Sequence, residues 1–223
     1  MFNRNPFDFI PWILDHQERF LSLLTQHIEL VLVAVLLGVL IAVPLGIVAT
    51  RVPALAGPMT WVAGVGQTVP SLAILGLALP IMGIGFVPSV FALTIRALMP
   101  IFINTYVGIH NADRSVIDAA RGMGANSTQR LLFAELPLAS PVIFTGIRTA
   151  TVQTVGLATL AAFIGGGGLG DLILQGLALV DVPVLLAGAI PVAVLAIGAD
   201  IVLGRIFRLA VPRGLQTSKA KAV

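Results

Sequence analysis

The sequence predicts an all-α membrane protein with five transmembrane helices. Of its 223 residues, 57% are hydrophobic and only 10% are charged, whereas a soluble domain carries about 25% charged residues. Several apolar windows reach the roughly 20 residues that a helix needs to cross a hydrocarbon core of about 30 Å. The alternating segments of about 10 residues that indicate a membrane β-barrel do not occur in the sequence.

The elements follow one another in a simple order. Residues 1–27 carry apolar side chains at helical spacing opposite charged ones, which predicts an amphipathic helix on the membrane surface. Residues 28–209 form the predicted transmembrane domain, and residues 210–223 form a basic tail. The five expected spans are residues 28–50, 58–80, 86–109, 141–164 and 182–207.

Three prolines interrupt the expected spans. Pro44, Pro70 and Pro100 each lack a backbone N–H, so each frees a carbonyl in the preceding turn and predicts a kink.

The positions of lysine and arginine predict the orientation. The connections after the second and fourth spans contain neither residue, and the remaining connections and the tail contain most of them. Nine basic residues follow the odd-numbered spans: Arg51, Arg114, Arg121, Arg130, Arg205, Arg208, Arg213, Lys219 and Lys221. Because basic loops stay in the cytoplasm, we expect the N-terminus outside and the C-terminus in the cytoplasm of a bacterial inner membrane. This distribution argues against a nucleic-acid partner, since the charges lie beside spans and form no patch.

The longest predicted cytoplasmic loop is residues 110–140, between the third and fourth spans. The segment from Asn111 to Asp113 can cap a short helix, which Gly122 and Gly124 can end. A second short helix can begin at Asn126. A plain connector needs neither two capped helices nor exposed leucines, so we expect a docking surface for a partner protein.

The residues of this loop resemble the EAA motif of permease subunits in binding-protein-dependent ABC importers. The matching residues are Asp118, Ala119, Ala120, Gly124, Leu136 and Pro137. Asp118 stands where the motif has Glu, and Ala134 stands where it has Ile. Pro137 is also expected to end the second short helix before the fourth span begins.

Three longer stretches extend the resemblance. Gly66–Pro80, Arg96–Ile109 and Thr154–Ile173 are similar to the glycine betaine, carnitine and choline branch of that family. The similarity covers nearly the whole chain from Ile28 to Asp181.

The resemblance implies one half of the membrane part of a type I importer. Such a permease pairs with a second, identical or similar permease and rests on two cytoplasmic ATPase subunits, while a periplasmic or lipid-anchored binding protein delivers the substrate. It implies that this chain contacts lipid and holds no cofactor, since ATP and magnesium bind the ATPase. The loop would be the coupling element, with Asp118, Ala119, Ala120, Gly124, Arg130, Leu136 and Pro137 as its candidate residues.

Polar residues inside the spans are few, and each has two interpretations. They can line the translocation pathway or gate it, or they can make ordinary hydrogen bonds between helices. The candidates are Gln67, Thr68, Ser71, Arg96, Asn104, Tyr106, Thr149, Gln153, Gly165 and Asp171. Arg96 near the middle of the third span needs protein or water around it, and Asp200 is a possible partner, although Asp200 could also pair with Arg205.

The connection between the fourth and fifth spans is expected to be a mobile external loop, a gate or a simple turn. Gly165–Gly168 permits a tight backbone path there. Asp171 and Asp181 make the connection acidic, with no lysine or arginine within it, which favours a cationic solute or a basic patch on a binding protein.

Two other classes of protein compete with a permease. An intramembrane enzyme lacks support, because the three histidines are scattered and the sequence contains no HExxH motif and no phosphate-binding GxxxxGK[ST] loop. A metal site is not expected either, since cysteine is absent. A secondary transporter or channel for small organic cations remains the alternative, although it would need ion-coupling acids and internal repeats.

Overall fold

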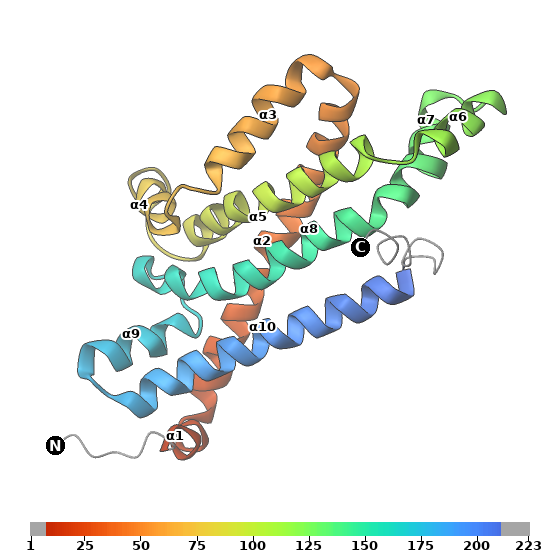
Figure 1. Cartoon of the computed structure of the whole chain (residues 1–223). Helices are drawn as coiled ribbons and strands as arrows, with labels where there is room; N and C mark the ends of the chain where they lie inside the picture. The colour runs from red at the N-terminus through yellow and green to blue at the C-terminus, as the bar shows by residue number, and fades with distance from the viewer. Residues whose placement is uncertain (1–7, 211–223) are drawn as a thin grey trace.

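The computed structural model describes residues 8–210, and in that range every regular element is helical (Figure 1). The elements are α1 (Phe9–Asp15), α2 (Gln17–Arg51), α3 (Pro53–Gly66), α4 (Ser71–Met82), α5 (Phe86–His110), α6 (Arg114–Gly122), α7 (Ser127–Arg130), the π-helix η2 (Leu131–Glu135), α8 (Leu136–Leu157), the 3₁₀-helix η3 (Ala158–Ile164), α9 (Gly170–Leu179) and α10 (Val182–Ala210). The predicted all-α membrane fold is confirmed. The basic tail, with Arg213, Lys219 and Lys221, lies outside the described residues.

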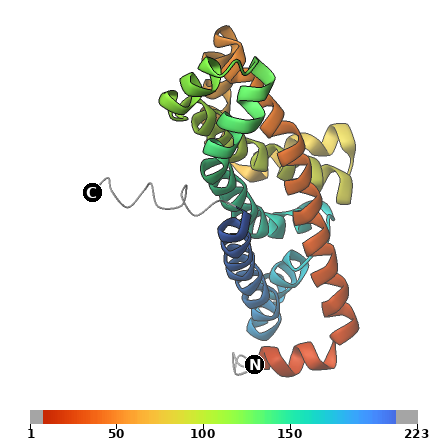
Figure 2. The same ribbon diagram turned by 90° about the vertical axis from the view of Figure 1, so that its right-hand side faces the viewer.

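Four helical stretches of the described chain are long and apolar enough to cross a membrane: α2, α5, the continuous helix through α8, and α10. The pair formed by α3 and α4 makes a fifth span if it is counted as one bent unit. α8 lies beside α10, and α2 crosses α5 and α8 (Figure 1), while Figure 2 shows α1 and α6 at opposite ends of the molecule.

The core forms where α2, α5 and α8 pack together. Its centre contains small side chains, such as Ala42, Ala97 and Ala150, all of which are buried. A Cβ added at Gly46 would lie 2.7 Å from Thr105, and one added at Gly146 would lie 2.6 Å from the Cβ of Asn104. Small residues let helix backbones approach closely, which is how helices associate where lipid removes the hydrophobic driving force.

The second predicted span is broken. α3 and α4 meet at an angle of 101°, so a single helix over residues 58–80 is wrong. The break comes at Val69-Pro70, because the proline ring disfavours helical backbone in the residue before it. Pro70 itself has an extended ψ of 131° and precedes α4. Pro44 and Pro100, by contrast, lie inside continuous helices.

The N-terminal segment is also divided differently from the prediction. The chain turns at His16, and residues 17–27 form the first turns of α2, which is 35 residues long. The amphipathic helix over residues 1–27 is therefore replaced, within the described range, by the short α1 and the start of α2. α1 contacts α10.

Pro137 does not end a helix. The chain is helical without interruption from Ser127 to Ile164, over 38 residues. A proline inside a helix clashes with the carbonyl of the preceding turn, and here the turn before it is the wider π-helix η2. The predicted loop of residues 110–140 is therefore non-helical only around α6 and before α7, and its last part is the beginning of a spanning helix.

Candidate functional site

The first helix of the predicted coupling loop is α6, and Asp113 caps it as expected. The Asp113 carboxylate accepts hydrogen bonds from the backbone N–H of Ser115, at 2.9 Å, and from the Ser115 hydroxyl, at 2.8 Å. These bonds satisfy a backbone donor that the first helical turn leaves free.

Gly124 ends α6 in a conformation that favours glycine. Its φ is +84°, and its N–H donates to the carbonyl of Arg121 while the N–H of Ala125 donates to the carbonyl of Ala120. This pair of bonds is a Schellman motif, in which the left-handed residue reverses the chain at a helix end. The glycine of the EAA-like motif therefore has a backbone function.

α7 begins with a reciprocal capping box. Asn126 accepts from the Gln129 N–H at 2.9 Å, and the Gln129 side chain accepts from the Asn126 N–H at 2.9 Å. The predicted second helix is confirmed, although it runs on into η2 and α8.

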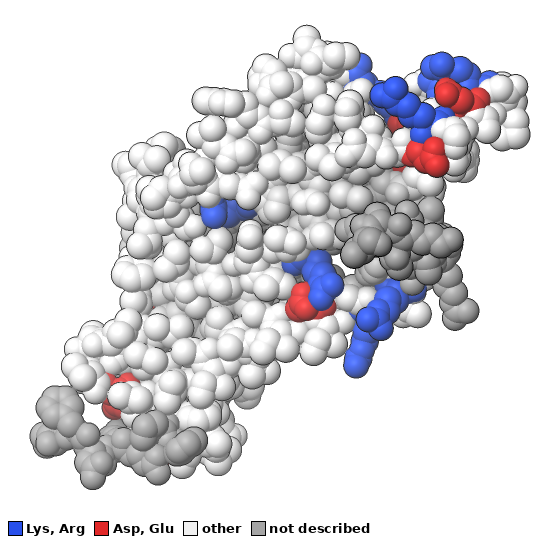
Figure 3. Space-filling view, viewed as in Figure 1, with Lys and Arg blue, Asp and Glu red and all other residues white. Residues whose placement is uncertain are grey.

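An apolar hollow of about 540 Å³ lies between α6 and the start of the long helix. Its lining residues are Val116, Ala119, Ala120, Met123, Gly124, Ala125, Gln129, Phe133 and Ala134. Met123 and Phe133 are 83% and 78% exposed. Basic and acidic atoms gather around this end of the molecule, whereas most of the face in Figure 3 is uncharged. The arrangement is an apolar seat with a charged rim, which suits a partner protein.

The predicted coupling residues occupy different places in this module. Ala119, Ala120 and Gly124 line the hollow, whereas Asp118 is exposed on α6. Leu136, Pro137 and the half-buried Arg130 belong to the long helix instead.

α8 carries a polar face along the membrane-spanning part of the molecule. Thr145, Thr149 and Gln153 follow one another at four-residue spacing, and all three are exposed. Four-residue spacing places side chains one above another on a helix. Thr149 and Gln153 are predicted pathway residues, and Thr145, which the prediction does not include, shares their face at the same spacing.

Arg148 lies on the same part of α8 and pairs with Asp200 of α10. Its Nε and Nη2 each donate to a carboxylate oxygen of Asp200 at 2.5 Å. The expected pairings of Asp200 with Arg96 or with Arg205 are therefore wrong. The side chains of Arg148 and Asp200 are 47% and 41% exposed. A charged pair this exposed is costly against lipid, so this face requires protein or water beside it.

Arg96 holds the break between α3 and α4. Its Nη1 donates to the carbonyls of Gly66, Gln67 and Val69, at 3.2, 3.1 and 3.3 Å. The last carbonyls of a helix lack intrahelical partners and form the negative end of the helix dipole. Arg96 therefore neutralises the end of α3, and its guanidinium needs no carboxylate for that.

The other predicted pathway residues do not form one site. Asn104 donates to the Pro100 carbonyl at 2.8 Å, and Tyr106 stacks on His110 with ring centroids 5.3 Å apart. The remaining residues, Gln67, Thr68 and Ser71, lie at the break before α4 and its first turn.

The glycine-rich turn before α9 is clamped between helices. Gly165, Gly167 and Gly168 have positive φ angles, and the N–H of Gly168 donates to the Gln26 side chain of α2 at 3.3 Å. A Cβ added at Gly166 would lie 2.1 Å from the Ser89 hydroxyl of α5. Of the expected alternatives, these contacts favour a simple turn.

Asp171, at the start of α9, has a basic neighbour that the sequence concealed. Arg19 of α2 donates to Gln175 at 2.6 Å. Burial raises the pKa of Asp171 above its ordinary value, and the charge of Arg19 acts in the opposite direction. The connection itself contains no lysine or arginine, as expected, but Arg19 from the N-terminal part of the chain reaches its helix.

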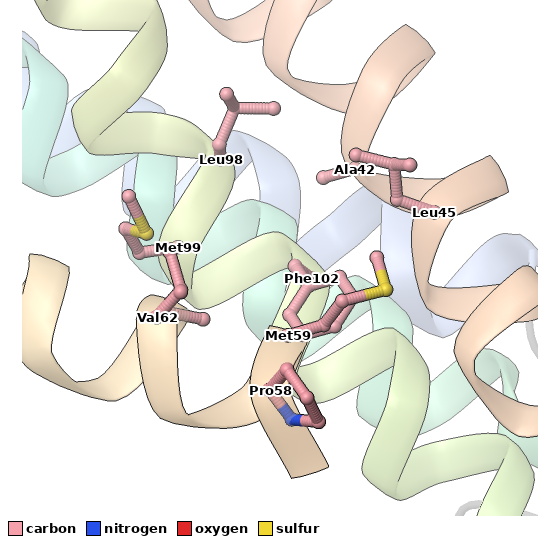
Figure 4. Close-up of a pocket in the computed structure, with 9 residues that line it drawn as sticks. Ala42, Leu45, Pro58, Met59, Val62, Leu98, Met99 and Phe102 are labelled. Atoms are coloured by element: carbon pink, nitrogen blue, oxygen red, sulfur yellow. The ribbon is translucent and has the colours of Figure 1, made fainter. Parts of the chain in front are cut away.

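A separate pocket of about 260 Å³ lies between α2, α3 and α5 (Figure 4). Met59, Met99 and Phe102 line it, together with aliphatic side chains. It offers almost no polar group to a charged solute and suits a hydrocarbon chain. Within residues 8–210, no three His, Asp or Glu side chains form a group that could hold a metal ion.

Comparisons with known proteins agree with this geometry. Residues 22–213 match the family described as binding-protein-dependent transport system inner membrane component. The choline transport system permease protein OpuBB of Bacillus subtilis is 46% identical over 194 residues, which cover 87% of this chain and 89% of that protein. The osmoprotectant import permease protein OsmW of Salmonella typhimurium is 40% identical, over 94% of this chain and 100% of that protein.

A solved structure shares the fold. The inward-facing MetNI methionine ABC transporter has a chain that superposes with a TM-score of 0.81 at 20% identity, covering 89% of this chain and 99% of that one. The helical architecture, the EAA-like loop and the family match lead to one assignment: this chain belongs to the binding-protein-dependent transport system inner membrane components, the permease subunits of type I ABC importers.

Proposed function

We propose that this chain is the permease subunit of an ATP-driven importer for quaternary ammonium osmoprotectants, such as glycine betaine, choline or carnitine. The named functions of relatives that are 40–46% identical support this substrate class. The observation that carries the transport role is the apolar seat of α6, built at the end of a helix that continues into a membrane span.

ATP hydrolysis belongs to a partner in this proposal. The sequence lacks a GxxxxGK[ST] phosphate loop, so energy reaches the chain through contact with an ATPase. Two ATPase subunits, a second permease and a substrate-binding protein complete the proposed importer. Its site is the bacterial inner membrane, with the α6–α7 end in the cytoplasm, as the basic residues of that end favour.

The polar face of α8 is the proposed lining of the translocation pathway. Thr149, Gln153 and the Arg148–Asp200 pair face outward from this chain, where a second permease would enclose them with water. Arg96 is instead proposed to have a structural role, because it binds carbonyls at the end of α3. The secondary transporter is not favoured, because the family assignment implies an external ATPase.

The first experiment co-expresses the permease with the ABC ATPase of the same importer and measures co-purification in mild detergent. Gly124→Val should reduce the ATPase recovered by roughly tenfold, because a β-branched residue at positive φ costs about 1–2 kcal/mol and distorts the end of α6. Gly124→Asn is the matched control and should retain most of the ATPase, since Asn tolerates this conformation better. A wild-type permease that recovers no ATPase would contradict the proposed function.

A further inference from the structure

An ion pair joins the end of α2 to the π-helix that follows the coupling helices. The Arg51 Nη1 donates to Glu135 Oε1 at 3.3 Å, and the Arg51 Nη2 makes a shorter contact with Oε2. The two residues are 84 positions apart in the chain. The Arg51 side chain is 35% exposed, whereas that of Glu135 is only 6% exposed.

The burial of Glu135 makes its pairing with Arg51 important for stability. A carboxylate taken out of water loses its hydration, and the cost is recovered only when a well-placed cation and hydrogen bonds replace that hydration. A hydrophobic residue could fill the same space without this cost. A bidentate guanidinium pair does what an apolar contact cannot, since its two parallel bonds fix both the distance and the relative angle of the groups they join.

Glu135 occupies a particular point of the long helix. It is the last residue of η2, which separates α7 from α8. Compared with an α-helix, a π turn contains an extra residue, so it offsets the side chains on its two sides by about 100° around the axis. α6 and α7 both contact η2. The buried carboxylate is therefore the place where the coupling module meets the membrane part of the same helix.

Arg51 occupies an equally particular point. It is the last residue of α2, and only Val52 separates it from α3. A cation at a helix C-terminus interacts favourably with the helix dipole. The Arg51 guanidinium is therefore stabilised both by the end of α2 and by Glu135. α3 leads directly to the break that Arg96 holds. Displacement of Arg51 would thus act on the α2–α3 corner and, through it, on the broken span.

We propose that the Arg51–Glu135 pair is a positioning link that transmits movement of the coupling helices to the α2–α3 corner. The inference rests on the proposed function, because it assumes that an ATPase moves α6 and α7. Neither residue touches substrate. The pair acts by holding η2 and the end of α2 at a fixed distance and angle, so that a shift of the coupling module moves two spans together.

The test uses the complete importer in liposomes, with radiolabelled glycine betaine and choline as transported probes and the cognate binding protein present. Two rates are measured on each preparation, namely substrate uptake and ATP hydrolysis. Arg51→Gln and Glu135→Gln should each lower the substrate transported per ATP hydrolysed by roughly two- to thirtyfold, while the ATPase still co-purifies. The exchanged double variant, Arg51→Glu with Glu135→Arg, should recover much of the loss, since it restores the pair.

Two further variants separate a link from a merely structural contact. Arg51→Lys keeps the positive charge but loses the bidentate guanidinium. It should assemble normally and show an intermediate ratio of substrate transported to ATP hydrolysed. Glu18→Gln removes an exposed carboxylate outside the pair and should leave the ratio unchanged. If Arg51→Gln disrupts assembly, the exchanged variant and Arg51→Lys still test whether the pair transmits movement to the α2–α3 corner.

The outcomes distinguish the two proposals. Assembled single variants with an unchanged ratio would overturn the link, as would an exchanged variant that assembles without recovering any coupling. An Arg51→Lys variant identical to the wild type would overturn the role of the bidentate geometry. A wild-type chain that never binds an ATPase would refute the proposed function instead, which the co-purification step reveals before any ratio is measured.

Discussion

Two charged side chains of the described residues bind the free backbone groups at helix ends. Arg96 closes the carbonyl end of α3, and Asp113 closes the amide end of α6. Each supplies a charge where backbone groups lack intrahelical partners, and each has the sign that the helix dipole favours. At the scale of single residues, these charged side chains stabilise the points where helices begin or end, and the chain bends at those points.

Asp113 makes this function dependent on pH. Hydrogen bonds from the Ser115 hydroxyl and backbone N–H lower the pKa of Asp113 below its ordinary value of 3.8. A lowered pKa means that the cap contributes stability above the ordinary value and loses it as the pH falls through the lowered one. We expect amide hydrogen exchange in the first turn of α6, relative to the intrinsic rate, to accelerate as the pH falls below this ordinary value.

The control for this prediction is Asp113→Asn. Asparagine also caps helices but does not titrate, so exchange in α6 should follow only the intrinsic pH dependence. Identical pH profiles for the wild type and Asp113→Asn would show that the cap is not the titrating group.

At the scale of elements, the helices differ in what their outward faces can contact. α2 presents aliphatic side chains outward, with Leu36 60% exposed and Leu40 69% exposed. α8 presents Thr145, Thr149 and Gln153. The two helices therefore need different surroundings. The aliphatic face of α2 is stable against lipid, whereas the polar face of α8 needs protein or water beside it.

This contrast predicts a difference in water access. The chain has no cysteine, so single cysteines can be placed without a background. Thr149→Cys in the assembled importer should react with a charged methanethiosulfonate reagent at least about tenfold faster than Leu36→Cys, because the reacting thiolate requires water. The rate is measured by loss of free thiol over time. Equal reaction rates at the two positions would contradict the proposal that α8 lines the pathway.

The helix ends were the elements most open to prediction. Asp113, Asn126 and Gly124 are local signals, because each acts on backbone groups within a few residues. Pro70 predicts a kink, whereas the structure has a full break of 101° there. The difference arises because Arg96 comes from another helix and stabilises carbonyls that a mere kink would not release.

The pairing of Arg148 with Asp200 could not be read from the sequence. It joins two helices whose relative rotation depends on all of their packing, and Asp200 had other arginines nearby in the sequence. Arg51 and Glu135 are a similar case across 84 positions. The π-helix at residues 131–135 adds to the difficulty, since one extra residue in a turn changes which side chains share a face.

At the scale of the whole molecule, the two ends have different proposed surroundings. α6 and α7 lie at one end, and α1 and α9 lie at the other (Figure 1). The orientation of the chain follows from its basic residues and stays a prediction.

Labelling from one side of the membrane tests that orientation. Ser127→Cys in α7 and Ala178→Cys in α9 both replace exposed residues. A membrane-impermeant maleimide should label Ala178→Cys in intact spheroplasts and Ser127→Cys only in inverted vesicles. The reverse pattern would place the coupling helices outside, where no ATP is available to drive them.

The continuous helix from Ser127 to Ile164 has one more consequence, which concerns the thickness of the bilayer. Its 38 residues extend about 57 Å, nearly twice the hydrocarbon thickness of about 30 Å. A helix this long meets a thinner membrane by tilting further, and tilt changes at modest energetic cost. Because α7 is the first turn of the same helix, its height above the lipid headgroups follows that tilt. We therefore expect the lipid composition of the membrane to change how far from its surface the proposed ATPase is held.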